Sequence, residues 1–564
     1  MNANQERIHA LLRQLYPGEQ ADWTYSEIIA LMAGAHPAVS YPSPYFSERT
    51  VTLITYGDTL QKAGEAPLQT LHHFLNRRLK GILDTVHILP FYPYSSDDGF
   101  SVLDYTAVDP KLGNWDDVSA LSADFRLMFD AVINHMSAQS EWFRRFLAGD
   151  PAYQGLFLTE SPQTNLSDVT RPRTSPLLTP FVRDDGQTVY AWTTFSADQV
   201  DLDYRDPRTL LRILRVLLFY LEKGAQVIRL DAIAYLWKEV GTNCIHLPQT
   251  HAVVQLIRAV LDSIAPHVIL ITETNVPHAE NISYFGDGLN EAQLVYNFTL
   301  PPLLFHTLLS GNASKLCGWI NALPAPRERT AFFNFTASHD GIGVRPVEGI
   351  LSAQETRNLI EAVEQRGGRV SYKANADGTA SPYELNISYV DAVAPPDMPE
   401  ALRVSCFILS QAIMLTLAGI PAVYIHSLLG SRNNVEGMLA TGHNRTINRA
   451  KLHEAVIEEQ LDNPHSFRAQ VFNAYIHLLK RRTASAAFHP HGSQRAFELN
   501  EGRVFAVERT SPDGSERILA VFNVAPEVQT VQLSEPSCAD ILTGEVCAGR
   551  TLTLAPYQVR WLRS

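Results

Sequence analysis

The sequence predicts an α/β fold: a closed (β/α)8 barrel with insertions after strands 3 and 7 and a C-terminal antiparallel β-domain. Short apolar runs, rich in β-branched and aromatic residues, alternate with longer segments whose apolar residues recur at helical spacing. This alternation is typical of parallel β-α units. Eight such runs are present, which is the number of strands in this type of barrel. They begin at residues 51, 85, 126, 226, 268, 293, 331 and 422.

The barrel is predicted to span residues 51–485, with further segments before, within and after it. Residues 1–50 are predicted as a helical leader that ends in a proline-rich join, "YPSPYF". Residues 137–205 and 345–400 are too long for simple β-α loops, so we expect insertions that shape specificity at the catalytic rim. Residues 490–564 contain four alternating runs broken by "SPDGSE", which predicts a small antiparallel β-domain.

Charge and hydropathy exclude two classes of function. A net charge of -13 argues against a general nucleic-acid binder, because such proteins need clustered Lys and Arg. No apolar stretch reaches the length of a membrane span, and the N-terminus lacks the apolar core of a signal peptide. We therefore expect a cytoplasmic protein whose partners are small molecules. The sequence leaves the oligomeric state open, with a homodimer as one option.

The cysteines and histidines predict no metal site. Five cysteines are scattered, odd in number and without a C-x-x-C pair, so reduced thiols are expected. Histidine-rich spots lack companions at metal-ligand spacing. We therefore predict neither a metal nor an organic cofactor. The cysteines are Cys244, Cys317, Cys406, Cys538 and Cys547.

Polar residues follow the predicted strands at the end where such a barrel carries its active site. A helix N-cap or a loop hydrogen bond would explain any one of them. Carboxylates on several different strands are better explained by catalysis. The residues are Asp130, Asn134, His135, Arg229, Asp231, Glu273, His339 and Asp340.

Three of these carboxylates suit the cleavage of a glycosidic bond, which needs a nucleophile, an acid and a negative neighbour for the developing charge. Asp231 lies two residues after Arg229 on the same strand face, and a guanidinium keeps a carboxylate ionised for attack. Glu273 has no adjacent cation in the sequence, so crowding and negative neighbours would raise its pKa and make it an acid. Asp340 is then the transition-state stabiliser.

The same segments resemble a known family. "DAVINH", "IRLDAIAY", "ITET" and "ASHDG" are similar to the four signature regions of the α-amylase superfamily, glycoside hydrolase family 13, and occur in the right order. The resemblance implies a barrel enzyme with the same three carboxylate roles. It also implies that His135, Arg229 and His339 contact the bound glucosyl ring.

Further blocks resemble the sucrose phosphorylase subfamily, among them "SSDDGFS", "VTRPRTSPL", "WTTFSADQVDLD", "SPYELN" and "HNRTINR". The resemblance implies that Asp97 and Arg445 grip glucose hydroxyls. It also places four residues around the sugar and acceptor sites, although each aromatic taken singly is more often a core residue. These four are Phe100, Phe195, Gln199 and Tyr235.

Enzymes of this subfamily transfer the glucosyl group to phosphate, so inorganic phosphate is the implied co-substrate. The resemblance assigns phosphate contacts to Arg173 and Tyr383. Prolines flank Arg173 and would hold it ready for a bidentate contact, while Arg171 is the alternative. Glu384, next to Tyr383, is also assigned to the phosphate and acceptor site. It stands where sucrose phosphorylases often carry Gln, which argues against simple sucrose specificity.

The length, the leader and blocks such as "TNVPHAENISYFG" resemble the glucosylglycerate phosphorylases more closely. Glucosylglycerate carries a carboxylate, so we expect an additional cation at the acceptor site. The candidates are Arg345, Lys238 and Arg432. Arg345 is preferred because only a short glycine turn separates it from the catalytic strand, and a salt bridge to Glu348 is its alternative role.

The resemblance implies reversible phosphorolysis of 2-O-α-glucosylglycerate to α-glucose 1-phosphate and glycerate by double displacement. One alternative is a phosphorylase of sucrose, sucrose 6'-phosphate or glucosylglycerol. A second is an α-glucoside hydrolase or transglucosidase, because the same carboxylates serve both and only exclusion of water separates them. A third is a non-catalytic binding protein, which the complete carboxylate set argues against. The sequence leaves the acceptor and the physiological direction open.

Overall fold

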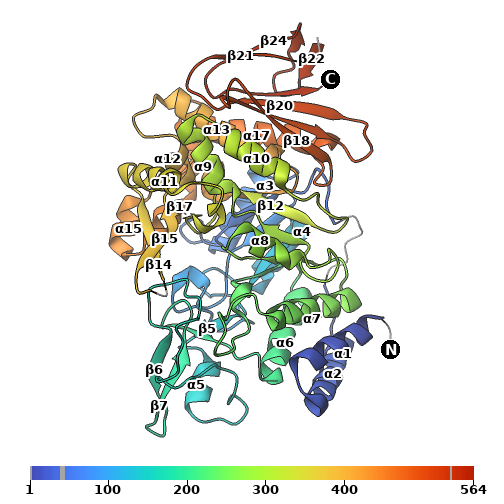
Figure 1. Cartoon of the computed structure of the whole chain (residues 1–564), viewed down its shortest axis with the longest axis vertical. Helices are drawn as coiled ribbons and strands as arrows, with labels where there is room; N and C mark the ends of the chain where they lie inside the picture. The colour runs from blue at the N-terminus through green and yellow to red at the C-terminus, as the bar shows by residue number, and fades with distance from the viewer. Residues whose placement is uncertain (1–2, 39–44, 376, 534–536, 564) are drawn as a thin grey trace.

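Eight parallel strands form a closed barrel in the middle of the molecule (Figure 1). The computed structural model describes residues 3–38, 45–375, 377–533 and 537–563, so residues 41–44 of the predicted proline-rich join lie outside the described residues. Strands that follow one another in the chain are neighbours in the barrel, and β16 closes it onto β1. The predicted barrel is confirmed. Its strands are β1 (Thr52–Thr55), β3 (Thr85–Ile88), β4 (Arg126–Ala131), β9 (Ala225–Leu230), β10 (Ile269–Thr272), β11 (Leu294–Tyr296), β12 (Ala331–Phe335) and β16 (Ile420–Tyr424).

The barrel strands are buried on both faces, one inside the barrel and the other under the surrounding helices. Strands in this position must be apolar throughout, which explains why the sequence shows continuous apolar runs there. The covering helices are α3 (Pro67–Arg78), α4 (Trp115–Asp124), α6 (Pro207–Glu222), α7 (Pro248–Ile264), α8 (His278–Asn281), α9 (Leu300–Ser310), α10 (Ser314–Ala322), α13 (Glu400–Thr416), α14 (Ile425–Leu428), α16 (Glu454–Asp462) and α17 (Phe467–Thr483).

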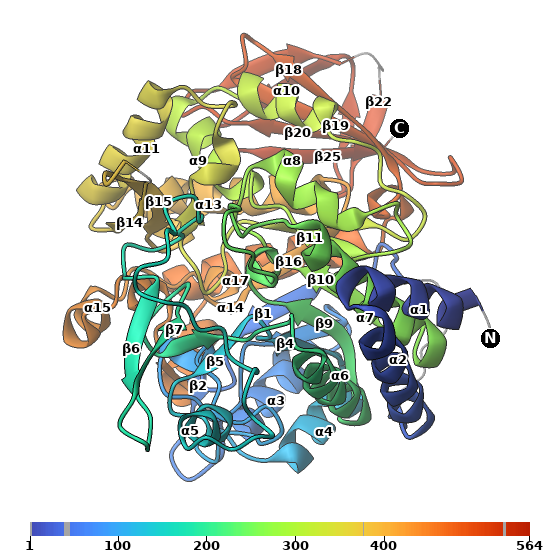
Figure 2. The same cartoon turned by 60° about the horizontal axis from the view of Figure 1, so that its bottom comes forward.

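Two helices precede the barrel, α1 (Ala3–Leu15) and α2 (Gly18–Ala33). Figure 2 shows them beside α6 and α7, with α1 packed on α7 and α2 on α6. The apolar face of α1 is buried in this contact, including Ile8 and Leu12. The leader therefore extends the helical layer on one side of the barrel.

The first insertion follows β4. It contains β5 (His135–Ser137), α5 (Glu141–Leu147), the antiparallel hairpin β6 (Leu178–Val182) and β7 (Thr188–Trp192), and β8 (Gln199–Asp201). β5 and β8 pair antiparallel, with His135 opposite Asp201. The insertion is thereby anchored at its base, directly above the end of β4.

The second insertion follows β12. It contains β13 (Ile342–Gly343), α11 (Ala353–Gln365), β14 (Arg369–Ala374), β15 (Ala380–Asn386) and α12 (Tyr389–Val393). The three strands form one antiparallel sheet in the order β13-β15-β14. After β16, the chain adds α15 (Val435–Thr441) and β17 (Leu452–His453), which pairs with β2 (Leu60–Gln61). Both predicted insertions are therefore present, while the domain limits proposed from the sequence stay a prediction.

The C-terminal region is an antiparallel β structure with its own apolar cluster. A six-stranded sheet runs in the order β18-β19-β20-β25-β22-β23, and β21 pairs with β24. This part lies at the top of Figure 1, against α10 and α13 of the barrel. The strands are β18 (Ser493–Leu499), β19 (Val504–Thr510), β20 (Arg517–Asn523), β21 (Gln529–Gln532), β22 (Ser537–Asp540), β23 (Val546–Ala548), β24 (Thr551–Leu554) and β25 (Val559–Arg563).

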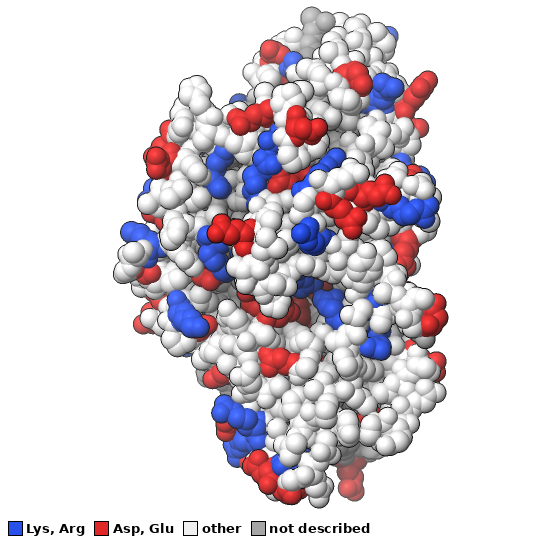
Figure 3. Space-filling model, turned by 90° about the vertical axis from the view of Figure 1, so that its left-hand side faces the viewer, with Lys and Arg blue, Asp and Glu red and all other residues white. Residues whose placement is uncertain are grey.

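Charged residues of both signs are interspersed over the face shown in Figure 3, without a large field of one sign. Such a surface differs from the clustered Lys and Arg that a nucleic-acid backbone requires. No helix among the described residues is both long and apolar enough to span a bilayer.

Candidate active site

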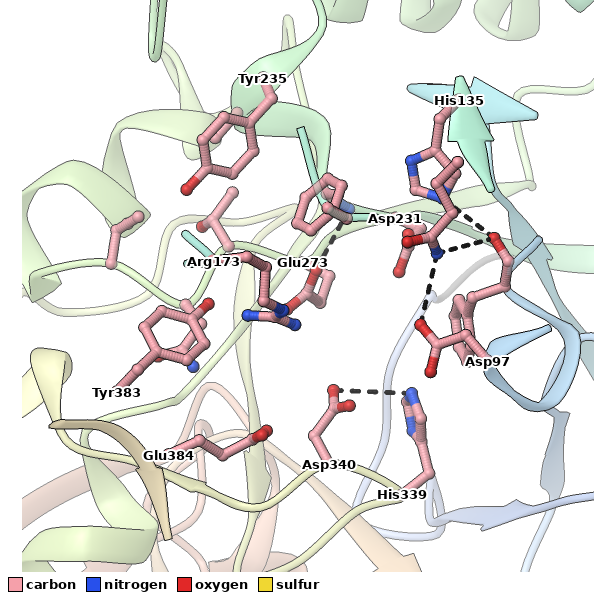
Figure 4. A pocket seen from close by; sticks show the side chains of 18 of the residues that line it. Asp97, His135, Arg173, Asp231, Tyr235, Glu273, His339, Asp340, Tyr383 and Glu384 are labelled. Carbon is pink, nitrogen blue, oxygen red and sulfur yellow. Dashed lines mark hydrogen bonds and ion pairs between the residues drawn. The ribbon is translucent and has the colours of Figure 1, made fainter. Parts of the chain in front are cut away.

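A cleft of about 650 Å³, open to solvent, lies at the C-terminal ends of the barrel strands (Figure 4). Side chains from both insertions and from the strand ends line it, as expected for a barrel of this type. The structure thus brings most of the predicted site residues together, while their chemical roles stay predictions. The predicted residues on its wall are Asp97, Phe100, His135, Arg173, Phe195, Gln199, Asp231, Tyr235, Glu273, His339, Asp340, Tyr383, Glu384 and Arg445.

Asp231 follows β9 directly and lines the cleft. Arg229 lies two residues earlier, and its Nη1 donates to Oδ1 of Asp231 at 2.6 Å. The same guanidinium pairs with the buried Asp130 of β4. Burial raises the pKa of the Asp231 carboxyl, and the Arg229 charge opposes that effect. Asp231 therefore has a fixed counter-charge that favours the carboxylate form, which nucleophilic attack requires.

Glu273 follows β10, the strand next to β9. Its Oε2 accepts a hydrogen bond from the backbone N–H of Ala232 at 3.1 Å and lies 3.8 Å from Nη2 of Arg229. Ala232 has a left-handed φ of 48°, so the backbone turns sharply after Asp231 and presents its N–H to Glu273. Burial, together with the charges of Asp231 and Asp340, raises the pKa of Glu273 to about 7. A carboxyl group that holds its proton near neutral pH is suited to general acid catalysis.

The rate of glycoside cleavage should fall as the pH rises above about 7. Glu273 can protonate a leaving oxygen only in its acid form, whose fraction falls about tenfold per pH unit above the pKa. The pH dependence of kcat/KM for a glycoside would test this. α-Glucosyl fluoride is the control, because fluoride leaves without a proton and should lack this decline. The same decline of kcat/KM at alkaline pH for both substrates would contradict the assignment of Glu273 as the acid.

Asp340 follows β12 across the cleft from Glu273 (Figure 4). Oδ1 of Asp340 lies 2.8 Å from Nη1 of Arg445 and 3.6 Å from Nη2 of Arg449. His339 Nε2 lies 3.5 Å from the other carboxylate oxygen. Burial alone would raise the pKa of Asp340, but Arg445 and its cationic neighbours hold it below its ordinary value. Asp340 is therefore ionised at neutral pH, as a group opposing a developing positive charge must be.

Aromatic and polar side chains form the wall beside Asp340. The ring of Phe100 stacks on His339 with centroids 4.9 Å apart and planes 4° from parallel. Gln199 donates to Oδ2 of Asp97 and to the carbonyl of Phe100, both at 3.3 Å. His135 Nε2 lies 3.0 Å from the same carbonyl. This wall offers a flat face and several hydrogen-bonding groups, which suits a sugar ring.

Arg173 lies on the opposite side of the cleft, between aromatic rings from the two insertions. Its guanidinium carbon is 5.1 Å from the ring centre of Tyr383 and 5.7 Å from that of Phe195. Tyr235 packs edge-on against Phe195. Arg173 donates to the carbonyl of Pro172, and no described carboxylate forms an ion pair with it. Figure 4 shows this charge pointing into the cleft near Glu273.

Two residues that were predicted to contact substrate lie away from the open part of the cleft. Arg229 lies beneath the cleft wall, 1% exposed, and contacts carboxylates rather than the open space where a sugar would bind. The prediction of Lys238 as an acceptor cation is not supported, because its ammonium pairs with Asp201 at 2.7 Å and donates to Asn134 at 2.8 Å. Lys238 is buried behind the cleft and joins the first insertion to the barrel.

The other candidate cations also lie outside the cleft wall. Arg345 is 3.7 Å from Glu348, the salt bridge that was the alternative expectation. Arg432 pairs with the buried Asp391. Arg171 donates to the carbonyl of Ser175 within its own loop. None of these three lines the described cleft, which leaves Arg173 as the cation on its wall without a carboxylate partner among the described residues.

The sequence interpretation missed two polar residues of the site. Asn275 lines the cleft two residues after Glu273, and its side-chain oxygen has no hydrogen-bond partner among the described residues. Arg449 pairs with Asp98 at 2.7 Å and donates to the carbonyl of His339. Asn275 is the second residue of "TNVPHAENISYFG" and Arg449 ends "HNRTINR", so both lay within motifs already recognised. What the motifs did not reveal was which of their members reach the cleft or contact its carboxylates.

Comparisons with known proteins agree with this architecture. Residues 79–319 match the catalytic domain of α-amylases, and residues 501–562 match the C-terminal immunoglobulin-like domain of D-apionate lactonase. The crystal structure of sucrose 6F-phosphate phosphorylase from Thermoanaerobacter thermosaccharolyticum has a TM-score of 0.74, with 24% identity, over 84% of this chain and 94% of that one. This similarity shows the fold.

Sequence relatives decide the family. The sucrose phosphorylase of Agrobacterium vitis is 32% identical over 440 residues, 74% of this chain and 85% of that protein. The glucosylglycerate phosphorylase of Spirochaeta thermophila is 50% identical over 527 residues, 92% of this chain and 89% of that protein. The chain belongs to the glucosylglycerate phosphorylase family. As a member of this family with an α-amylase catalytic domain, it is a glycosyltransferase of the phosphorylase type.

The charged side chains on the cleft wall are carboxylates and guanidinium groups. Among the residues that the structure describes, no group of three or more His, Cys, Asp or Glu side chains is arranged to hold a metal ion. The absence of a metal or organic cofactor stays a prediction from the sequence.

Proposed function

We propose that the protein is a retaining phosphorylase that reversibly converts 2-O-α-glucosylglycerate and inorganic phosphate into α-glucose 1-phosphate and glycerate. One observation carries this proposal: a single cleft holds the three predicted catalytic carboxylates and, beside them, the guanidinium of Arg173 without a carboxylate partner among the described residues. The carboxylates suit glucosyl transfer, and the free positive charge suits an anionic acceptor. Membership of the glucosylglycerate phosphorylase family supports the choice of glycerate.

In the first half of the reaction, Asp231 attacks the anomeric carbon and forms a covalent β-glucosyl ester. Glu273 gives its proton to the glycosidic oxygen, so glycerate leaves as a neutral alcohol at that oxygen. Asp340 opposes the positive charge that develops on the sugar ring. Both Asp231 and Glu273 contact the guanidinium of Arg229, which is consistent with the short separation of a retaining pair.

In the second half, a phosphate oxygen attacks the same carbon from the face that glycerate has left, and Asp231 is released as a carboxylate. Two inversions give the retained α configuration. If phosphate enters as the monoanion, Glu273 accepts its proton and is ready for the next cycle. In the reverse direction, the Glu273 carboxylate removes the proton from the attacking glycerate hydroxyl.

Arg173 is proposed to hold the negative charge of both acceptors. Phosphate and the glycerate carboxylate occupy the acceptor side at different times, so one cation can serve each in turn. Arg445, the other guanidinium on the cleft wall, is already shared by Asp340 and Glu384. A guanidinium bonds both carboxylate and phosphate through two parallel N–H groups, which suits this double use.

Arg173→Ala should lower kcat/KM for phosphate and for glycerate alike, each on the order of 10²-fold, because a charge-assisted bidentate contact is lost. Rates of phosphorolysis and of glucosylglycerate synthesis from α-glucose 1-phosphate would measure the two effects. Arg345→Ala is the comparison, and we expect it to change both values less than about threefold. A loss limited to glycerate, and found only in Arg345→Ala, would instead assign the acceptor carboxylate to Arg345.

The substrate is tested by incubating the protein and phosphate with glucosylglycerate, sucrose, sucrose 6'-phosphate or glucosylglycerol. α-Glucose 1-phosphate should form fastest from glucosylglycerate. Formation from another donor but not from glucosylglycerate would refute the choice of glycerate. Equal release of free glucose with and without phosphate would indicate a hydrolase instead.

We also propose that inorganic phosphate is the sole co-substrate and that the enzyme works in the cytoplasm. The carboxylates and Arg173 supply the acid, nucleophile and anion contacts that the reaction needs. Cys244, Cys317 and Cys406 are buried free thiols, which fits a reducing compartment. Activity that survives treatment with a metal chelator would support the first part.

A further inference from the structure

We infer that Glu384 is a positioning residue that holds Arg445 and the backbone after Asp340, and thereby fixes the carboxylate of Asp340 toward the sugar. The sequence pointed to Glu384 as an acceptor contact instead. The inference rests on the proposed glucosyl transfer, but it does not depend on glycerate being the acceptor.

The carboxylate of Glu384 is largely occupied by protein donors. Glu384 lines the cleft but is only 2% exposed. Its Oε1 accepts from the backbone N–H of Gly341 at 2.9 Å and from Nη2 of Arg445 at 3.0 Å. Its Oε2 accepts from Nε of Arg445 at 3.1 Å. A carboxylate has about four acceptor positions, so these bonds leave little capacity for a ligand.

The third nitrogen of the same guanidinium points to Asp340. Nη1 of Arg445 lies 2.8 Å from Oδ1 of Asp340, while the other edge of the group forms the fork with Glu384. A guanidinium is planar and rigid, so an arginine held along one edge has a fixed orientation at the other. Glu384 therefore determines where the charge of Arg445 meets Asp340.

Glu384 also fixes the backbone that carries Asp340. The chain passes from Asp340 through Gly341 into β13, which pairs with β15 and places Gly343 opposite Glu384. A Cβ atom at Gly341 would lie 2.6 Å from Cγ of Glu384 and 2.6 Å from the carbonyl oxygen of Leu385. Only glycine fits this close approach. The second insertion therefore directly contacts the peptide that follows Asp340. Figure 4 shows Glu384 beside Asp340.

The arrangement also preserves the negative field at the sugar. Arg445 paired with Asp340 alone would neutralise the charge that opposes the transition state. Shared with Glu384, the same cation stands between two carboxylates, which leaves a net charge of -1 on the three groups. Fixed charges of this kind act most strongly where water is excluded, and Glu384 and Asp340 are largely shielded from solvent.

The test uses α-glucosyl fluoride as donor and phosphate as acceptor. Fluoride carries no acceptor-side group, so this reaction reports on the sugar side of the site. Glu384→Gln keeps the size and an acceptor for Gly341 but removes the charge and weakens the fork to Arg445. We expect kcat to fall about 30-fold, while KM for phosphate stays within about threefold. An unchanged kcat with a raised KM for phosphate or glycerate would overturn the inference and return Glu384 to the acceptor site.

Two controls separate positioning from misfolding. Glu364→Gln removes an exposed charge from α11 of the same insertion and should leave kcat and the thermal unfolding midpoint unchanged. Arg445→Lys cannot form the fork, so Glu384 has no further effect through it in this variant. The double variant should therefore lose no more kcat than Arg445→Lys alone. Additive losses would contradict the inference, even if Glu384→Gln alone were unstable. If glucosylglycerate is not cleaved, the fluoride assay still reports on Glu384.

Discussion

Asp231→Asn should reduce glucosyl transfer on the order of 10⁴-fold or more, which would be the largest single effect in the cleft. An amide cannot form the glucosyl ester, so both halves of the reaction lose their shared intermediate. The substitution also leaves the Arg229 guanidinium with Asp130 and the more distant Glu273 as its anionic partners. Formation of α-glucose 1-phosphate from glucosylglycerate and phosphate would measure the loss.

Intact-protein mass spectrometry would identify the nucleophile directly. When the reaction with α-glucosyl fluoride is quenched, the native enzyme should show a glucosyl adduct and Asp231→Asn should show none. Asp185→Asn, in an exposed turn of the first insertion, is the matched control and should retain full activity. An adduct that persists in Asp231→Asn would place the nucleophile elsewhere.

Glu273→Gln should give the second large effect, and that effect should depend on the leaving group. Cleavage of glucosylglycerate should fall about 10³-fold, because its leaving oxygen needs a proton. Transfer from α-glucosyl fluoride to phosphate should be much less affected, because fluoride leaves unprotonated and the phosphate dianion attacks without a base. Equal losses with both donors would show that Glu273 does not act as the acid.

The same substitution should stabilise the fold at alkaline pH, which excludes unfolding as the cause of lost activity. Burial raises the pKa of Glu273 from 4.5 to about 7, so the folded state holds this proton more tightly than the unfolded chain. The associated stability is present below about pH 4.5 and is lost as the pH rises through 7. Glutamine carries no such charge. At pH 8 the free energy of unfolding of Glu273→Gln should therefore exceed that of the native protein by up to about 3 kcal/mol. Denaturant unfolding at acidic and alkaline pH would measure the difference.

The roles of the cations show where sequence reasoning reached its limit. Arg173 and Lys238 both stand near recognised motifs, and neither motif shows whether the charge is free. The structure gives Lys238 two buried partners, Asp201 and Asn134, whereas Arg173 has aromatic rings and no described carboxylate. The interpretation of Glu384 changed for the same reason, because its partner Arg445 lies 61 residues further along the chain.

The sequence by itself determined the barrel and the positions of Asp231, Glu273 and Asp340. Strands buried on both faces must be apolar throughout, and catalytic residues follow their C-terminal ends. The strands and the residues after them can therefore be predicted from local sequence patterns. Only the tertiary structure decided which charges remain available in the cleft. An ion pair depends on two side chains meeting in space. Residues that separate insertions bring together have no characteristic spacing in the sequence, so the sequence does not show that they pair.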